Sequence, residues 1–156
     1  MMKLKTEYEQ LLGVILEDLR VCLQYTPNRE NDLLCFMEQY IKAPKELRPT
    51  ILQNLRACMD GKEYPNPYAV YQHYGEQEIN LLEQLLRGYL QDMQSCSDKE
   101  LVLTNLIAAI NDLQDKCCGQ LIDNWRKDHL TQLLALAAKE QCLSSAIAVI
   151  DSENRW

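Results

Sequence analysis

The apolar residues of this chain recur at spacings of three and four over long segments, and this periodicity limits the folds that the chain can adopt. In residues 6–25 the repeat comprises Tyr8, Leu11, Leu12, Ile15, Leu19, Cys22 and Leu23. Such spacing places apolar side chains on one face of a helix. No run of alternating apolar and polar residues is long enough to build a sheet. The pattern therefore predicts an all-α protein.

Glycine and proline are sparse, at five of each, and most of them lie between the periodic segments, where they end helices. Capping boxes at Thr6-x-x-Glu9 and Ser97-x-x-Glu100 indicate two helix starts, and Gly61 and Gly119 indicate two helix ends. The predicted helices cover residues 6–25, 31–43, 48–60, 76–94, 98–117 and 124–141, and a short seventh after Ser144 is favoured over an unpaired strand. We expect a single domain over residues 1–156, a bundle of six to seven mostly antiparallel helices.

The predicted core includes the apolar residues of the second helix and most of the isolated cysteines. In the second helix these are Leu33, Leu34, Met37, Tyr40 and Ile41, and the isolated cysteines are Cys22, Cys35, Cys58, Cys96 and Cys142. Seven cysteines cannot pair completely, which indicates reduced thiols. The start of the chain lacks the uncharged apolar region of a secretory signal, and no segment resembles a membrane span. We expect a cytoplasmic protein without membrane association.

The charge of the chain is uneven. Residues 1–62 carry nine Lys/Arg and nine Asp/Glu, whereas residues 63–156 carry seven and fourteen, the entire net charge of −7. This asymmetry predicts a neutral sub-bundle over 1–62 and an acidic one over 76–156, joined by a Tyr-rich linker over 63–75. An acidic half repels phosphate backbones, so it argues against direct nucleic-acid binding and favours a basic protein partner. The alternative is that the acidic surface serves solubility alone.

Motifs that would carry catalysis are missing from the sequence. It contains no Gly-rich phosphate loop, no G-x-S-x-G, no H-E-x-x-H and no C-x-x-C. His129 could ligate a metal with Asp112 or Asp115, but charges at a helix start are the favoured interpretation. The pair Cys117-Cys118 is interpreted as one core and one surface residue rather than a redox pair. We therefore expect a protein that is not an enzyme and that holds no metal or cofactor.

The stretch YPNPYAVYQHYG, residues 64–75, holds four of the eight tyrosines. Pro65 and Pro67 favour extended backbone, and Tyr68, Tyr71 and Tyr74 can face one way on a short helical turn. Tyrosines are enriched at interfaces because they offer a large apolar area and a polar tip. Two interpretations stay open, a docking surface and a lid packed over the junction of the two sub-bundles.

A set of short motifs in the second half resembles a family of small bacterial, all-helical domains of unknown function. They are Leu103-Thr104-Asn105, then Ile110-Asn111-Asp112-Leu113-Gln114, then Leu121-Ile122-Asp123 with Arg126 after it. Asp123 and Asn124 stand where that family has glutamate and threonine, and the match covers about a third of the chain. The resemblance implies a bacterial, helical, cytoplasmic protein and supplies no activity. From the residues themselves, we expect Asn111 to tie its helix to the loop at Gly119, and Arg126 to pair with Asp112 or Asp115.

These features together predict a non-enzymatic binding protein, an immunity- or antitoxin-like inhibitor of a basic toxin or nuclease. The expected partner contacts are Tyr68, Tyr71, His73, Tyr74, Glu76, Glu78, Asp92, Asp98 and Glu100. One alternative is a small-ligand binder or enzyme whose pocket lies under the linker and uses His73 and Tyr71. Another is a homodimeric scaffold.

Overall fold

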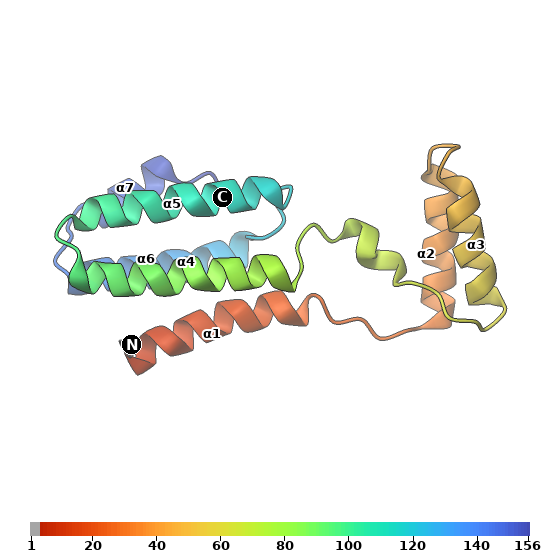
Figure 1. Ribbon diagram of the computed structural model, residues 1–156, viewed down its shortest axis with the longest axis horizontal. Helices are drawn as coiled ribbons and strands as arrows, with labels where there is room; N and C mark the ends of the chain where they lie inside the picture. Colours follow the sequence, from red (N-terminus) through yellow and green to blue (C-terminus); the bar gives the residue numbers. More distant parts are fainter. Residues whose placement is uncertain (1–3) are drawn as a thin grey trace. The chain divides into compact units, whose positions relative to one another are not determined.

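The structure is a computed structural model that describes residues 4–156, so Met1 to Lys3, the basic start of the chain, lie outside it. Its helices are α1 (Thr6–Val21), α2 (Arg29–Lys42), α3 (Arg48–Met59), the 3-10 helix η1 (Pro67–Tyr71), α4 (Glu76–Ser95), α5 (Lys99–Lys116), α6 (Asn124–Glu140) and α7 (Ala146–Glu153) (Figure 1). The described residues contain no strand, which confirms the all-α prediction. Between residues 4 and 156, no helix combines the length and the apolar character that crossing a membrane requires.

The chain forms two compact units. The first, the bundle, runs up to Leu23 and resumes over His73–Trp156, and the second, the hairpin unit, is Gln24–Gln72. These boundaries differ from those of the predicted sub-bundles, 1–62 and 76–156, because α1 belongs to the same unit as α4–α7. The apolar stripe of α1 is buried, and it packs against α4 and α6 rather than against α2 and α3.

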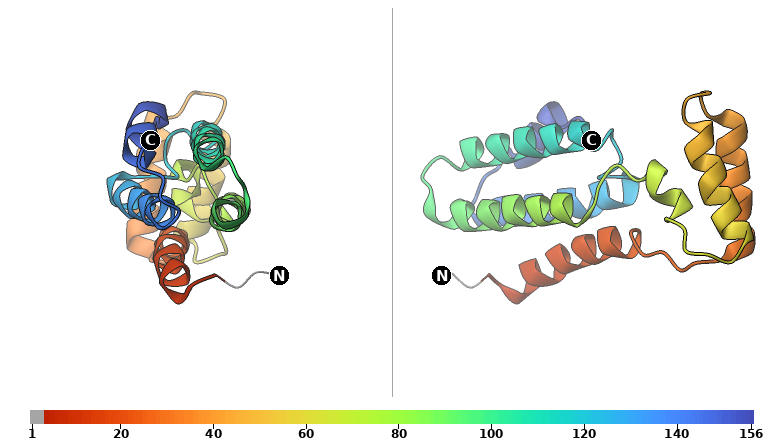
Figure 2. Two further views of the ribbon diagram at one scale, coloured as in Figure 1. Left: turned by 90° about the vertical axis from the view of Figure 1, so that its left-hand side faces the viewer. Right: turned by 45° about the vertical axis from the view of Figure 1, so that its right-hand side comes forward.

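The bundle is built around the antiparallel pair α4 and α5. Helix α7 packs on α5, and α6 packs against all four other helices of the bundle (Figures 1 and 2). Its fully buried side chains include Leu12, Ile15 and Leu19 of α1, Ile79, Leu82, Leu86, Leu90 and Met93 of α4, and Leu103, Ile107 and Ile110 of α5. Each such side chain contributes about 1.5–3 kcal/mol by leaving water. Burial of one continuous apolar core therefore holds the five helices together.

Within residues 4–156, five ion pairs fasten the α1 segment to α4 and α6. They join Lys5 with Glu140, Arg20 with Glu76 and with Glu83, Arg87 with Glu9, and Arg126 with Asp18, at N···O distances of 2.7, 2.8, 3.6, 2.7 and 2.7 Å. Each pair joins residues at least 56 positions apart along the chain. Five carboxylates of the acidic bundle are thus already occupied by the fold.

Both predicted capping boxes are wrong in detail. Helix α1 begins at Thr6 itself with no side-chain cap, and Glu9 binds Arg87 instead of the helix start. Helix α5 is capped by Asp98, whose carboxylate accepts from the backbone N–H of Leu101. In each case a competing partner or a neighbouring cap took the place of the predicted one.

The predicted helix ends at glycine are confirmed. Gly61 and Gly119 have φ values of +70° and +76°, a left-handed conformation that glycine adopts without steric cost. Pro49 lies in the first turn of α3, where its missing N–H leaves no hydrogen bond unmade. The tail after Ser144 is a helix, α7, although it begins at Ala146 and has no side-chain cap.

The hairpin unit consists of α2 and α3 side by side, with η1 against α2. Asp32 of α2 is 1% exposed and accepts hydrogen bonds from the hydroxyl groups of Tyr25 and Tyr64 and from the backbone N–H of Asn28. Tyr25 precedes α2 and Tyr64 follows α3. This buried carboxylate therefore ties the incoming and outgoing chain to one helix.

The apolar residues predicted to face inward from α2 mostly do not. Leu34, Met37 and Ile41 are 60%, 45% and 73% exposed, whereas Leu33 and Tyr40 are half-buried. The buried positions of α2 are instead Asp32, Cys35 and Phe36. A unit of two helices can bury only one side of α2, so the apolar side chains on its other side stay exposed.

The isolated cysteines are less buried than predicted. Cys35 and Cys58 are buried, but Cys22, Cys96 and Cys142 are exposed. These three come just after the last turns of α1, α4 and α6, where the chain leaves the packed face. The pair at the end of α5 is as predicted, with Cys117 buried and Cys118 exposed.

Candidate partner-binding site

The nine residues predicted to contact a partner lie in three separate places. Tyr68 and Tyr71 lie on η1 of the hairpin unit, His73, Tyr74, Glu76 and Glu78 lie at the start of α4, and Asp92, Asp98 and Glu100 lie around the turn between α4 and α5. Helix α4 has 20 residues, which span about 30 Å. The second and third groups therefore lie at opposite ends of this helix, and the nine residues do not form one site.

The two tyrosines of η1 line a shallow groove in the hairpin unit. Tyr68 and Tyr71 are 39% and 51% exposed, and the groove of about 530 Å³ also includes Leu34, Glu38 and Lys42 of α2. The short helical turn predicted for the linker is therefore present. Its tyrosines face a mixed apolar and charged surface, without an acidic excess.

The group at the start of α4 is largely used by the fold. The hydroxyl of Tyr74 donates to the backbone carbonyl of Leu19 at 3.3 Å, and Glu76 accepts from Arg20 at 2.8 Å. His73 is exposed and Glu78 is half-buried. Tyr74 and Glu76 thus serve as contacts between α1 and α4 rather than as free partner contacts.

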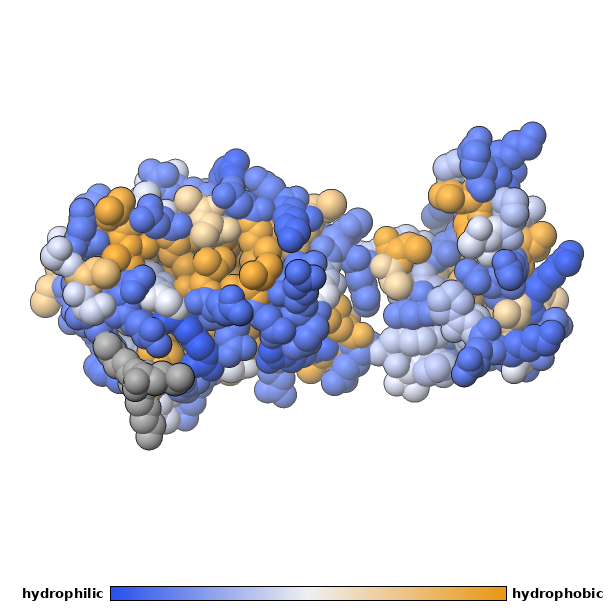
Figure 3. Space-filling model, in the orientation of Figure 1, coloured by the Kyte–Doolittle hydropathy of each residue, from blue (hydrophilic) through white to orange (hydrophobic). Residues whose placement is uncertain are grey.

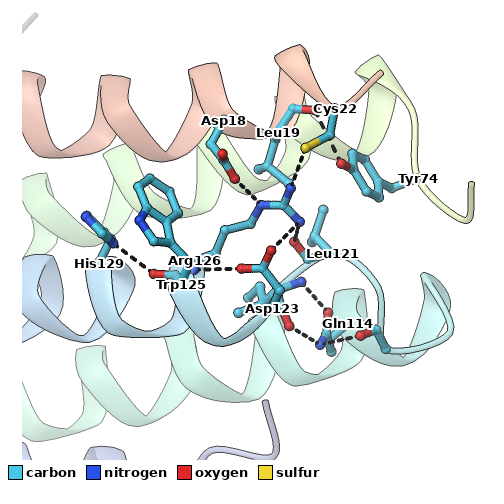
Figure 4. Close-up of polar contacts among 12 residues, drawn as sticks. Asp18, Leu19, Cys22, Tyr74, Gln114, Leu121, Asp123, Trp125, Arg126 and His129 are labelled. Carbon is cyan, nitrogen blue, oxygen red and sulfur yellow. Dashed lines mark hydrogen bonds and ion pairs between the residues drawn. The ribbon is translucent and has the colours of Figure 1, made fainter. Parts of the chain in front are cut away.

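Arg126 is the most heavily bonded side chain of the bundle (Figure 4). Its guanidinium donates to the carboxylate of Asp18 at 2.7 Å, to the backbone carbonyl of Leu121 at 3.2 Å and to the sulfur of Cys22 at 3.2 Å. It also lies 5.7 Å from the ring centre of Tyr74. Burial is the largest single effect and disfavours the charged form, but the hydrogen bond to Asp18 together with the interactions with Tyr74, Asp123 and Asp18 outweighs it, and the pKa of Arg126 is raised. Buried on all sides, this cation holds α1 to α6 and is not open to a ligand.

The polar contacts around Arg126 correct two predictions from the sequence. Arg126 pairs with Asp18 and Asp123, whereas Asp112 and Asp115 pair with Arg155. The loop at Gly119 is held by Gln114, whose side chain bonds the backbone of Gly119 and Ile122 (Figure 4). Asn111 instead bonds the backbone of Glu153 and Arg155, and so holds the chain after α7. Both predicted residues have structural roles, but with other partners.

His129, for which metal ligation with Asp112 or Asp115 was the alternative, bonds the backbone of its own helix. Its Nδ1 lies 2.8 Å from the backbone carbonyl of Trp125, which can only accept, so Nδ1 carries the proton. The two rings stack with centres 3.8 Å apart, and Trp125 is 43% exposed. Within residues 4–156, no cluster of three or more His, Cys, Asp or Glu side chains is placed to hold a metal ion.

An apolar groove runs between α4 and α5. Its lining includes Leu81, Leu85 and Gly88 of α4 and Leu101, Val102 and Ala109 of α5. Figure 3 shows hydrophobic residues gathered over the band between these two helices. The part nearest the α4–α5 turn has a volume of about 630 Å³, and Leu101 beside it is 53% exposed. The bundle thus leaves an apolar strip uncovered along its central helix pair.

Carboxylates at one end of this groove lack cation partners. Asp92 and Asp98 line the groove at the α4–α5 turn, and Glu100 is exposed in the first turn of α5. Within residues 4–156, no Lys or Arg forms an ion pair with any of the three. An apolar floor with negative charges at its rim is complementary to an apolar surface with positive charges at its edge.

A second apolar groove, between α6 and α7, has the opposite character. It has a volume of about 520 Å³ and is lined by Leu136, Leu143 and Ile147, and its one charged lining residue is Lys139. A basic partner would meet a like charge there. The groove between α4 and α5 is therefore the better candidate for a basic partner.

Asp92, Asp98 and Glu100 were predicted from the sequence as partner contacts, but the groove beside them was not predicted. A signal was present, since α4 carries the adjacent apolar pairs Leu81-Leu82 and Leu85-Leu86. One residue of each pair suffices for the core, and Leu82 and Leu86 are fully buried. The second residue of each pair widens the apolar arc beyond what the core needs.

The candidate site is thus the groove between α4 and α5 together with Asp92, Asp98 and Glu100 at its end. Comparison with protein-family models, with curated proteins and with solved structures finds no match to this chain.

Proposed function

We propose that the chain is a non-enzymatic acidic binding module, an immunity- or antitoxin-like inhibitor that neutralises a basic toxin or nuclease. The observation that carries this proposal is the group formed by Asp92, Asp98 and Glu100, without cation partners and beside an apolar groove. Glu76 and Glu83 of α4 and Glu9 of α1 are bound to Arg20 or Arg87 instead. Asp92, Asp98 and Glu100 combine the lack of an ion pair within residues 4–156 with a place beside an apolar groove.

The distribution of charge supports a basic partner. The bundle carries ten Lys/Arg and seventeen Asp/Glu, whereas the hairpin unit carries six of each. All of the net charge of −7 therefore belongs to the bundle. Long-range attraction to a basic protein would speed its encounter with the bundle, most strongly at low ionic strength.

The inhibition follows from the same charges. A nuclease presents Lys and Arg side chains to the phosphates of its substrate. Carboxylates held at the rim of an apolar groove can occupy those cations while the groove buries apolar surface of the enzyme. The complex would then exclude the substrate without any reaction catalysed by this chain.

The test compares three forms of the full chain as bait in the lysate of its own host. They are the unaltered chain, the groove variant Asp92→Asn/Asp98→Asn/Glu100→Gln, and the control Glu7→Gln/Glu17→Gln/Asp128→Asn. Both variants lose three negative charges, and the control sites are exposed positions on α1 and α6. Asparagine at position 98 keeps the N-cap, since Asn and Asp cap helices equally well.

We expect a basic protein that elutes with salt from the unaltered chain and the control, and that binds the groove variant at least about tenfold more weakly. The purified partner must then lose its nuclease or toxic activity when the unaltered chain is added in equal amount. Equal capture by the two variants, or a captured protein whose activity is unaffected, would refute the proposal.

A small-ligand site is a second candidate, favoured by the groove of about 530 Å³ beside Tyr68 and Tyr71. His73, expected in such a site, belongs to the other unit. A library of metabolites screened by thermal shift tests this candidate. A ligand whose stabilising effect disappears in Tyr71→Ala but persists in His73→Ala would support it, whereas no stabilising ligand would refute it.

A further inference from the structure

We infer that the groove between α4 and α5 binds a single amphipathic helix of the partner, about three turns long, with its basic residues at the α4–α5 turn. This inference rests on the proposed function and specifies the part of the partner that is recognised. It depends on the length, shape and charge of the groove.

The length of the groove matches a short helix. Two hollows, of about 440 and 630 Å³, share Gln84, Leu85 and Ala109 and so form one continuous groove. On α4 it extends from Leu81 to Asp92, a separation of eleven positions, which corresponds to about 17 Å at 1.5 Å per residue. A helix of about three turns lying parallel to α4 would fill it.

The shape of the groove suits a helix rather than an extended strand. Two neighbouring helices form a furrow into which the side chains of a third helix can pack, at about 8–10 Å between axes. Gly88 lies in this furrow, and a β-carbon built on it would meet no atom within 4 Å. Open space above Gly88 lets a partner side chain reach the backbone of α4, between Leu85 and Val102.

The charges at the two ends of the groove differ, and this difference determines which end of the bound helix would carry its basic residues. At the α4–α5 turn, Asp92 and Asp98 line the groove without a cation. At the other end Asp112 is accompanied by Lys116, and Arg155 lies 3.9 Å from the Asp112 carboxylate. Lys or Arg side chains of the partner are therefore favoured only at the α4–α5 turn.

The test uses a displayed library of helix-forming peptides of about 14 residues with an apolar stripe at helical spacing and all other positions randomised. It is selected against the full unaltered chain, and the enriched peptides are then measured against two variants. Gly88→Leu fills the groove, and Gly13→Leu makes the same change on the exposed face of α1, where a β-carbon also meets nothing within 4 Å. Both replace a helix-interior glycine, so neither is expected to lower the melting temperature.

We expect enriched peptides that carry Lys or Arg at one end of the stripe and bind Gly88→Leu at least about tenfold more weakly than Gly13→Leu. Their affinity for Asp92→Asn/Asp98→Asn should fall about three- to tenfold, with a weaker dependence on salt. Peptides without a basic end, equal binding to both leucine variants, or no enrichment would overturn the inference.

The two proposals can fail independently. If Gly88→Leu still inhibits the captured toxin or nuclease, the proposed function stands and the groove is not its site. If basic helical peptides bind the groove but no toxin or nuclease is captured, the groove is a helix-binding site with another biological purpose.

Discussion

Replacing Arg126 by methionine should destabilise the bundle, because the guanidinium donates a hydrogen bond to a buried backbone carbonyl that would otherwise be left without a donor. The carbonyl of Leu121, a residue with no exposed surface, would lose the donor at 3.2 Å, at a cost of about 1–3 kcal/mol. The side chain of Asp18 is 34% exposed and can hydrate, so its lost pair adds only about 0–1 kcal/mol. Methionine fills much of the vacated volume. We expect the free energy of unfolding to fall by about 1–4 kcal/mol, or about 2–16 °C in melting temperature.

Tryptophan fluorescence during denaturant unfolding measures this loss for the bundle alone. Both tryptophans, Trp125 and Trp156, lie in the bundle, and the hairpin unit has none. Arg155→Met is the matched control, because the side chain of Arg155 is 61% exposed and its partners Asp112 and Asp115 are exposed too. The control should lose less than about 0.5 kcal/mol. A loss below about 1 kcal/mol for Arg126→Met would show that the network in Figure 4 does not hold α1 to α6.

Three further predictions concern single carboxylate and hydroxyl groups. Asp92→Asn should raise the free energy of unfolding by about 0.3–1 kcal/mol, measured by denaturant unfolding, because a negative charge in the last turn of a helix opposes the helix dipole. The hydrogen bond from Arg87 holds the pKa of Glu9 below 4.5, so its stabilisation is present above pH 4.5 and is lost as pH falls through the lower folded-state pKa. The difference in melting temperature between the unaltered chain and Glu9→Gln should therefore shrink between pH 7 and about pH 3, and a constant difference would contradict this. The bond to Asp32 raises the pKa of Tyr64 from 10 to about 12, so its contribution is complete below pH 10 and disappears as pH rises through about 12. The tyrosinate absorbance missing in Tyr64→Phe should titrate near 12, and a midpoint near 10 would refute the bond.

The helices were predictable because their signals are local. The positions of Gly61 and Gly119 ended helices as expected, since the left-handed conformation they adopt depends on the residue itself. The capping boxes failed because a carboxylate can serve distant cations as well as its own helix. Glu9 binds Arg87, which is 78 residues away, and no local pattern contains that contact.

The division into units could not be predicted from the helices alone. The apolar stripe of α1 would look the same whichever helices covered it. The choice of α4 and α6 as its partners comes from long-range contacts such as Arg20 with Glu76, 56 residues apart. The same limit applies to α2, where Asp32 is buried because Tyr25 and Tyr64 bond it from either side of the helical hairpin.

The candidate site could be predicted only in part, because the sequence does not show which carboxylates the fold uses. Glu76 and Asp92 were both predicted to contact a partner, yet Glu76 is bound to Arg20 and Asp92 has no such partner in residues 4–156. The net charge of −7 therefore predicts a basic partner, but only the geometry shows which carboxylates the ion pairs of the fold leave unpaired within residues 4–156.

Asp92 is the residue at which local stability and the proposed function oppose one another. It lies in the last turn of α4, which contains no basic residue, so its charge is disfavoured by the helix dipole. Asp98, by contrast, is favoured where it is because it caps α5. A residue that breaks a local rule without a visible compensation inside the fold is expected at functional sites. The nearby ammonium of Lys99 donates to the backbone carbonyl of Met93, and within residues 4–156 it forms no ion pair with Asp92. The proposed basic partner would supply that pair, which would account for the cost of Asp92 to the fold and for its place on the rim of an apolar groove.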